Sequence, residues 1–189
     1  MDEVFWSVGR TSGMFSLCLL TLGLLLGIVN RSGRSFSGLS RYTLTLLHRN
    51  ASLLALGFLL LHFTSLWLDP QARLRLADLA VPFLGSFKPF WQGLGTLAFL
   101  MLLAVGATGL LRRRIGQRTF TAVHWLSYAL WPVAVAHGLG NGTDAGSWWY
   151  RLAAAASILL VGAAVIWRLS ANYHEAAAIR RASQKGLVK

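Results

Sequence analysis

Charged residues are scarce in this chain of 189 residues: only 13% are Asp, Glu, Lys or Arg, while 55% are hydrophobic. Soluble globular domains usually carry about 25% charged residues. The deficit therefore excludes a disordered chain and argues against a water-soluble domain. Acidic residues are the scarcest, with six Asp and Glu against 18 Lys and Arg. A single cysteine, Cys18, excludes a disulfide framework within the chain.

The net charge of +12 would indicate a nucleic-acid-binding protein if the basic residues formed a stripe on a soluble fold. In this sequence they lie between apolar runs, where basic residues indicate membrane topology instead. We therefore expect contact with membrane lipid and no nucleic-acid partner.

Long hydrophobic runs dominate the sequence, and a helix needs about 20 apolar residues to cross a bilayer core. Five segments approach this length, at residues 13–29, 43–68, 93–111, 120–139 and 148–167. Backbone polar groups in lipid must be satisfied internally, so each segment is expected to be helical. The sequence predicts an all-α integral membrane protein with a bundle of five transmembrane helices, or six if residues 69–92 contain another. Residues 1–170 would form this domain and residues 171–189 a basic tail, which leaves no length for a flavin or nicotinamide domain.

Lys and Arg gather after the first and third apolar segments and in the tail, whereas the loop at residues 138–147 contains neither. Cytoplasmic loops of membrane proteins carry the excess of Lys and Arg. We therefore predict a multi-pass protein of a cell membrane, such as the bacterial inner membrane, with its C-terminal tail in the cytoplasm.

Four of the five histidines lie inside predicted spans, His48 and His62 in the second and His124 and His137 in the fourth. Ionisable residues at this depth are costly and usually face the bundle interior. His48 and His62 are 14 residues apart, so an ideal helix places them about 21 Å apart and roughly 40° from eclipsed. His124 and His137 are 13 residues apart, which leaves them roughly 140° out of phase in an ideal helix. Pro132 lies between them, and proline can change the local turn.

The second and fourth spans enter the membrane from the same side, so the topology pairs His48 with His124 and His62 with His137. Each pair could supply both axial nitrogens of one haem iron, an arrangement that favours electron transfer over oxygen binding. Zinc or copper would need ligands much closer together than His48 and His62. A proton relay usually includes intramembrane Asp or Glu, which these spans lack. A single haem, or no cofactor, are the remaining alternatives.

Haem propionates need cationic or donor partners. Arg49, beside His48 within the same span, is the predicted cofactor-binding residue of this kind, whereas topology and headgroup contact explain the other basic residues better. His174 lies in the basic tail and is expected to be solvated or to face lipid headgroups, and not to be a ligand. No catalytic acid or base is predicted, because the haem would carry the redox chemistry.

The histidine-containing segments resemble those of the ferric reductase-like transmembrane domain superfamily. The superfamily includes ferric reductases, the membrane domain of NADPH oxidases and the haem-binding membrane subunit of methionine sulfoxide reductase. The matching segments are His48-Arg49, Leu61-His62-Phe63, Val123-His124-Trp125 and Ala136-His137-Gly138. The resemblance covers residues 10–170 and implies two stacked b-type haems held by these four histidines. Many relatives have six spans, with ligands on the third and fifth, and some carry a fused flavin and nicotinamide domain.

The resemblance implies the membrane subunit of an oxidoreductase. Electrons would pass from a cytoplasmic or quinol donor, through the two haems, to an extracytoplasmic acceptor such as ferric iron, a flavoprotein or a methionine sulfoxide reductase. The donor would be a separate flavoprotein reductase or quinol. The alternatives are a quinol-coupled cytochrome b relay subunit of a larger complex, and a haem-binding sensor or assembly protein.

Overall fold

The fold comes from a computed structural model that describes residues 2–32, 38–70, 72, 74–170 and 173. These residues form helices and connecting segments, and no strand occurs among them. The helices in chain order are α1 (Asp2–Ser32), α2 (Arg41–Leu68), α3 (Leu76–Ala80), α4 (Pro89–Leu110), α5 (Arg112–Ile115), α6 (Gln117–His124), α7 (Ser127–Asn141), the short 3-10 helix η1 (Thr143–Gly146) and α8 (Trp148–Leu169). The predicted all-α architecture is therefore confirmed.

Four described helices, α1, α2, α4 and α8, are long and apolar enough to cross a membrane. They correspond to the first, second, third and fifth predicted spans, so the chain is a multi-pass membrane protein. The predicted count of five is not confirmed, because the fourth span, residues 120–139, is divided between α6 and α7. In the described part of residues 69–92, the only complete helix is the five-residue α3.

The break between α6 and α7 is a short stretch of 3-10 turn. The backbone N–H groups of Leu126, Tyr128 and Ala129 each donate to the carbonyl three residues earlier, at 2.9–3.1 Å. Pro132 lies in the first half of α7. Proline has no N–H for the carbonyl of residue 128, and its ring crowds that carbonyl. The chain tightens almost two turns before the proline, as a 3-10 segment does.

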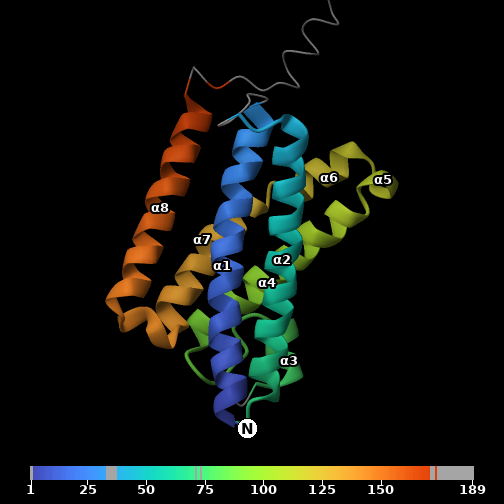
Figure 1. Cartoon of the computed structure of the whole chain (residues 1–189). Helices are drawn as coiled ribbons and strands as arrows, with labels where there is room; N and C mark the ends of the chain where they lie inside the picture. Colours follow the sequence, from blue (N-terminus) through green and yellow to red (C-terminus); the bar gives the residue numbers. More distant parts are fainter. Residues whose placement is uncertain (1, 33–37, 71, 73, 171–172, 174–189) are drawn as a thin grey trace, which may run out of the picture.

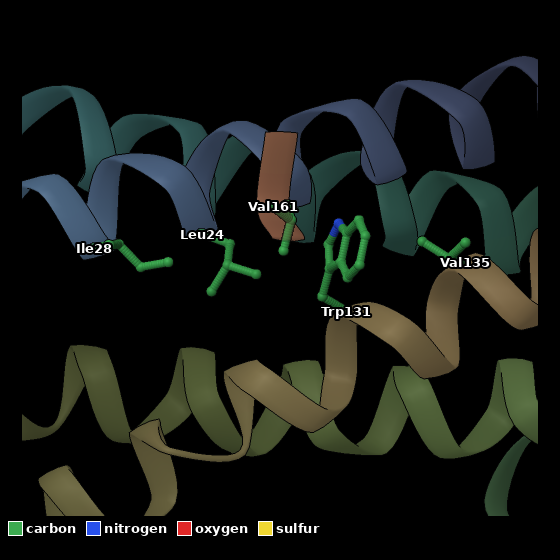
Figure 2. Packing of buried hydrophobic residues seen from close by; sticks show 5 residues of the cluster. All are labelled: Leu24, Ile28, Trp131, Val135 and Val161. Carbon is green, nitrogen blue, oxygen red and sulfur yellow. The ribbon is translucent and has the colours of Figure 1, made fainter. Parts of the chain in front are cut away.

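The helices pack in two layers (Figure 1). The first layer is α8, α1 and α2, and the second is α4 and α7, which lie obliquely behind them. A buried cluster joins α1, α7 and α8 (Figure 2), and it consists of Leu24, Ile28, Trp131, Val135 and Val161. A second cluster joins α4 to α7 and consists of Ala98, Leu102 and Leu130. Both clusters attach α7 to the rest of the bundle, which fixes the element that carries His137.

The connection between α2 and α4 is held by Asp78. Its carboxylate accepts hydrogen bonds from the backbone N–H of Arg75, at 3.1 Å, and from the Arg75 guanidinium, at 2.9 Å. The Thr96 hydroxyl of α4 donates to the Asp78 carbonyl at 2.8 Å. These bonds cap the N-terminus of α3 and attach it to α4, since a helix start presents unpaired N–H groups. The hydrogen bonds to Arg75 lower the pKa of Asp78.

Candidate functional site

The structure brings the four intramembrane histidines together in the two predicted pairs. The rings of His48, on α2, and His124, the last residue of α6, have centroids 6.1 Å apart. The rings of His62, on α2, and His137, on α7, have centroids 6.5 Å apart. The parallel course of α2 and the α6–α7 segment, expected from the topology, produces this pairing.

The 3-10 stretch explains how His124 and His137 can both face α2, although an ideal helix would place them out of phase. An α-helix turns about 100° per residue, whereas a 3-10 helix turns about 120°. Each residue of 3-10 turn between His124 and His137 therefore adds roughly 20°. The stretch reduces the mismatch of roughly 140°. The break in the fourth predicted span is thus what lets its two histidines meet those of α2.

Three of the histidines donate through Nδ1 to a backbone carbonyl of a neighbouring helix. The Nδ1–O distances are 2.8 Å from His48 to Gly23, 2.6 Å from His62 to Gly9, and 2.8 Å from His137 to Trp91. A carbonyl can only accept, so the proton of each neutral ring is assigned to Nδ1. Nε2 then carries the free lone pair, which is the form that binds a metal.

The Nδ1 atom of His124 is buried and has no hydrogen-bond partner among the described residues. Its ring stacks on Phe120 of the same helix, with centroids 5.0 Å apart. His124 therefore differs from the other three histidines, because no described carbonyl orients its ring.

Glycines make room for the three oriented rings. A Cβ atom built on Gly13 would lie 2.8 Å from the His62 ring, on Gly27 3.2 Å from the His48 ring, and on Gly95 2.5 Å from the His137 ring. Real Cβ atoms essentially never approach another heavy atom within 3.0 Å. Reasoning from sequence missed these contacts; the signal was that Gly13 and Gly27 have the same separation along the chain as His48 and His62.

The family model for the ferric reductase like transmembrane component matches residues 12–135. The chain belongs to this family. The match covers about two-thirds of the sequence and includes His48, His62 and His124, while His137 lies two residues beyond it. No curated protein and no solved structure matches the chain.

Ferric reductase-like transmembrane domains commonly bind haem, and both histidine pairs fit such a group. Two imidazoles bonded through Nε2 to one metal, at about 2 Å each, have ring centroids about 6 Å apart. The observed separations of 6.1 and 6.5 Å match this value. Groups of three or more His, Cys, Asp or Glu that could hold a bare metal ion are absent from the described residues. Each pair supplies two imidazoles, which is a donor set that a haem iron accepts.

A cavity of about 390 Å³ adjoins the His62–His137 pair. Its size falls in the range of about 300–1,000 Å³ that is usual for cofactor and ligand sites. Phe63 lies among its mostly apolar lining residues, and Arg10 and Lys88 contribute positive charge. Asn141 also lines it, and the buried Oδ1 of this residue has no hydrogen-bond partner among the described residues. An apolar cavity with a few charged and polar groups suits a porphyrin that carries propionates.

The cations of the cavity already have protein partners. Arg10 forms an ion pair with Asp144, with 3.3 Å between nitrogen and oxygen, and Lys88 donates to the Gly140 carbonyl at 3.2 Å. Arg49, the cation predicted from sequence, is exposed on α2 and forms no hydrogen bond or ion pair with a described residue. It is adjacent to His48 but about 100° around the helix, so its role stays a prediction. The basic tail, with His174, lies outside the described residues except for Tyr173.

Proposed function

We propose that the chain moves electrons across the membrane through two b-type haems. Their axial ligands would be the pairs His48–His124 and His62–His137. The observation that supports this is the double pairing of imidazoles, with centroid separations that suit a shared metal. In three of the four rings the Nδ1 atom is engaged by a carbonyl, which leaves Nε2 for the iron.

A bound haem supplies a one-electron redox couple. The four histidines would hold the haems, and two imidazoles on one iron would favour electron transfer over oxygen binding. The carbonyls of Gly9, Gly23 and Trp91 orient three of the rings and would make them more basic, which would favour the ferric state of a bound haem. The mostly apolar lining of the cavity would limit contact between water and a bound haem. The protein thus contributes position, ligand basicity and exclusion of solvent.

The spacing of the two pairs suits transfer across a bilayer. His48 and His62 lie on the same helix, α2, and are separated by about 21 Å along its axis. The hydrocarbon core is about 30 Å thick, so the two pairs divide the crossing into short steps. The basic loops predict that the His48–His124 pair lies toward the cytoplasm.

The donor in this proposal is a separate flavoprotein reductase or quinol, and the acceptor lies outside the cytoplasm. The chain would then be the membrane subunit of an oxidoreductase. Arg10 and Lys88 would bind propionates of the haem between His62 and His137, in addition to their present contacts with Asp144 and the Gly140 carbonyl. Arg49 would have the same role near His48.

The test is a reduced-minus-oxidised visible spectrum of the purified protein, with haem quantified per chain. We expect two b-type haems, about one after His62→Ala or His137→Ala, and about one after His48→Ala or His124→Ala. The double variant His48→Ala, His62→Ala should bind none. His174→Ala is the matched control and should retain both haems. A haem-free wild-type protein, or haem content indifferent to the four substitutions, would overturn the proposal.

A further inference from the structure

The same arrangement surrounds each of the three oriented histidines: a backbone carbonyl accepts from Nδ1, and a glycine lies against the ring. In each case the accepting carbonyl belongs to a residue four positions before the glycine that faces the ring. These carbonyl–glycine pairs are Gly9 with Gly13, Gly23 with Gly27, and Trp91 with Gly95. A helical side chain leans toward the N-terminus, over the turn that contains the carbonyl four residues earlier. A glycine leaves that carbonyl uncovered, so an imidazole can reach it.

The two carbonyl–glycine pairs on α1 are separated along the chain by the same number of residues as the two histidines that they contact. The separation between Gly13 and Gly27 along the chain equals that between His48 and His62 on the neighbouring helix. Because α1 and α2 are consecutive and antiparallel, the later glycine serves the earlier histidine. Equal spacing keeps both glycines in register with both rings.

Helix α4 carries the same repeat, although only its first carbonyl–glycine pair is occupied. Trp91 and Gly95 serve His137. Val105 and Gly109, again four positions apart, follow them at the same separation that divides the two pairs on α1. Helix α4 packs against both α7 and α6, and the chain reverses between α4 and α6. The repeat therefore predicts that Gly109 lies at the level of His124, as Gly95 lies against the His137 ring.

Two observations show that this second position on α4 is open. A Cβ atom on Gly109 would meet nothing within 4 Å. The Nδ1 atom of His124 is buried without a hydrogen-bond partner among the described residues. Leaving a buried donor unpaired is costly, and the other three histidines all avoid this cost by the same device.

We propose that the Val105 carbonyl accepts the Nδ1–H of His124 in the haem-loaded protein, and that Gly109 is the positioning residue that keeps this carbonyl accessible. The inference rests on the proposed haem ligation and assigns the missing fourth orienting contact. The bundle then holds its four ligands by four equivalent carbonyl–glycine pairs, two on α1 and two on α4.

The neighbouring Thr108 hydroxyl is the rival acceptor. It donates to the carbonyls of Ala104, at 2.8 Å, and Val105, at 3.1 Å, and its oxygen retains a lone pair. The rival makes a different prediction, because removing the hydroxyl would disturb His124 while a methyl group on Gly109 would not.

The experiment compares glycine substitutions by redox titration and low-temperature electron paramagnetic resonance of each ferric haem. Gly109→Ala is expected to retain both haems. It should raise the midpoint potential of the haem between His48 and His124, which is the haem that His124→Ala loses, and it should shift the electron paramagnetic resonance signal of that haem. The reason is that a lost acceptor makes the axial imidazole less basic and destabilises the ferric state. Gly162→Ala, at a helical glycine that also has nothing within 4 Å, is the matched control and should change neither haem. Gly95→Ala is the positive control and should alter only the haem of the His62–His137 pair.

Several outcomes would overturn the inference. Gly109→Ala could behave like Gly162→Ala, or Thr108→Val could shift the same haem while Gly109→Ala does not. If Gly109→Ala fails to accumulate, proton magnetic resonance of the ferric wild-type protein decides, because four slowly exchanging ring N–H signals are expected and three would contradict it. A failure of the proposed function is distinguished beforehand, since the wild-type protein would lack two haems or His124→Ala would retain both.

Discussion

At the scale of single residues, the glycines that face the histidines differ in how closely they approach the rings. A Cβ atom on Gly13 or Gly95 would come within 3.0 Å of an imidazole, while one on Gly27 would stay 3.2 Å away. Contacts between 3.0 and 3.4 Å require a neighbour to move by only a few tenths of an ångström. The tolerance of each site for a methyl group should follow this order.

We therefore predict that Gly13→Ala and Gly95→Ala lose the haem between His62 and His137, whereas Gly27→Ala retains both haems. The displaced ring in the first two variants can no longer direct Nε2 at the iron. Haem per chain, measured on purified protein, should fall from two to about one in these variants alone. Equal haem loss in all three variants would show that ring clearance does not determine binding. Gly57→Ala, on the same helix as His62 and with open space around it, is the control.

At the scale of single elements, the break between α6 and α7 sets the direction of His124 relative to His137. Straightening it should rotate one histidine away from α2, because an uninterrupted helix leaves the two roughly 140° out of phase. The buried clusters that attach α7 to the bundle contain Leu130, Trp131 and Val135, which all follow the break, so we expect them to form in its absence.

Pro132→Ala is expected to fold and insert normally but to bind about one haem instead of two. Alanine at position 132 has a backbone N–H, which can donate to the carbonyl of residue 128, whereas proline has none. Alanine also favours a continuous helix. Haem quantification together with circular dichroism separates cofactor loss from unfolding. Pro82→Ala, in the connection before α4, should leave the haem content unchanged. A Pro132→Ala protein with two haems of normal potential would show that the 3-10 stretch arises from another cause.

The cap of α3 gives the connection between α2 and α4 a defined pH dependence. The pKa of Asp78 is lowered first by the Arg75 side-chain hydrogen bonds and then by the Arg75 backbone N–H. A carboxyl group with a lowered folded-state pKa stabilises the fold above its unfolded pKa, and this contribution is lost as the pH falls through the folded value. The stabilisation is thus present at neutral pH and disappears in strong acid.

Limited proteolysis of the segment before α4 should report this effect. In the wild-type protein, cleavage is expected to be slow at neutral pH and to accelerate below about pH 4. Asp78→Asn should be cleaved faster at neutral pH and should lose most of the acid dependence, because its side chain cannot ionise. Since most proteases fail in acid, pepsin is used at low pH and trypsin at neutral pH, each compared with Asp144→Asn as the control. If Asp78→Asn and the wild-type protein show the same pH profile, the cap does not hold this segment.

At the scale of the whole molecule, the sequence was sufficient to predict the features that depend on apolar length and on spacing. Uninterrupted apolar runs predicted five spans, and four of these are helices of span length among the described residues. The separation of His48 and His62 along the chain predicted that they share one face of α2. The pairing with His124 and His137 followed from topology, because only parallel helices bring these residues together in this order. Each of these features follows either from the sequence of a single helix or from the direction in which the chain crosses the membrane.

Features that depend on contacts between helices could not be predicted in this way. Pro132 was visible in the sequence, but the break lies almost two turns earlier, at Trp125 and Leu126. The helical period of the sequence does not indicate where such a break falls. In the sequence, Gly23 and Gly27 are two small residues four positions apart, a pattern that by itself indicates only close helix packing. The structure shows their separate roles, because His48 lies against both. Gly23 provides the accepting carbonyl, and Gly27 leaves space for the His48 ring.

The proposed arrangement requires both haems for a crossing, because each histidine pair covers only part of the bilayer thickness. We therefore predict that the wild-type protein, placed in vesicles that contain trapped ferricyanide, reduces this ferricyanide when a membrane-impermeant reductant is added outside. His48→Ala and His62→Ala should each lower the rate to nearly that of protein-free vesicles, although each retains one haem. His174→Ala should transfer electrons at the wild-type rate. Rapid ferricyanide reduction in either single-haem variant would contradict a series path and would instead indicate that one haem is accessible from both sides.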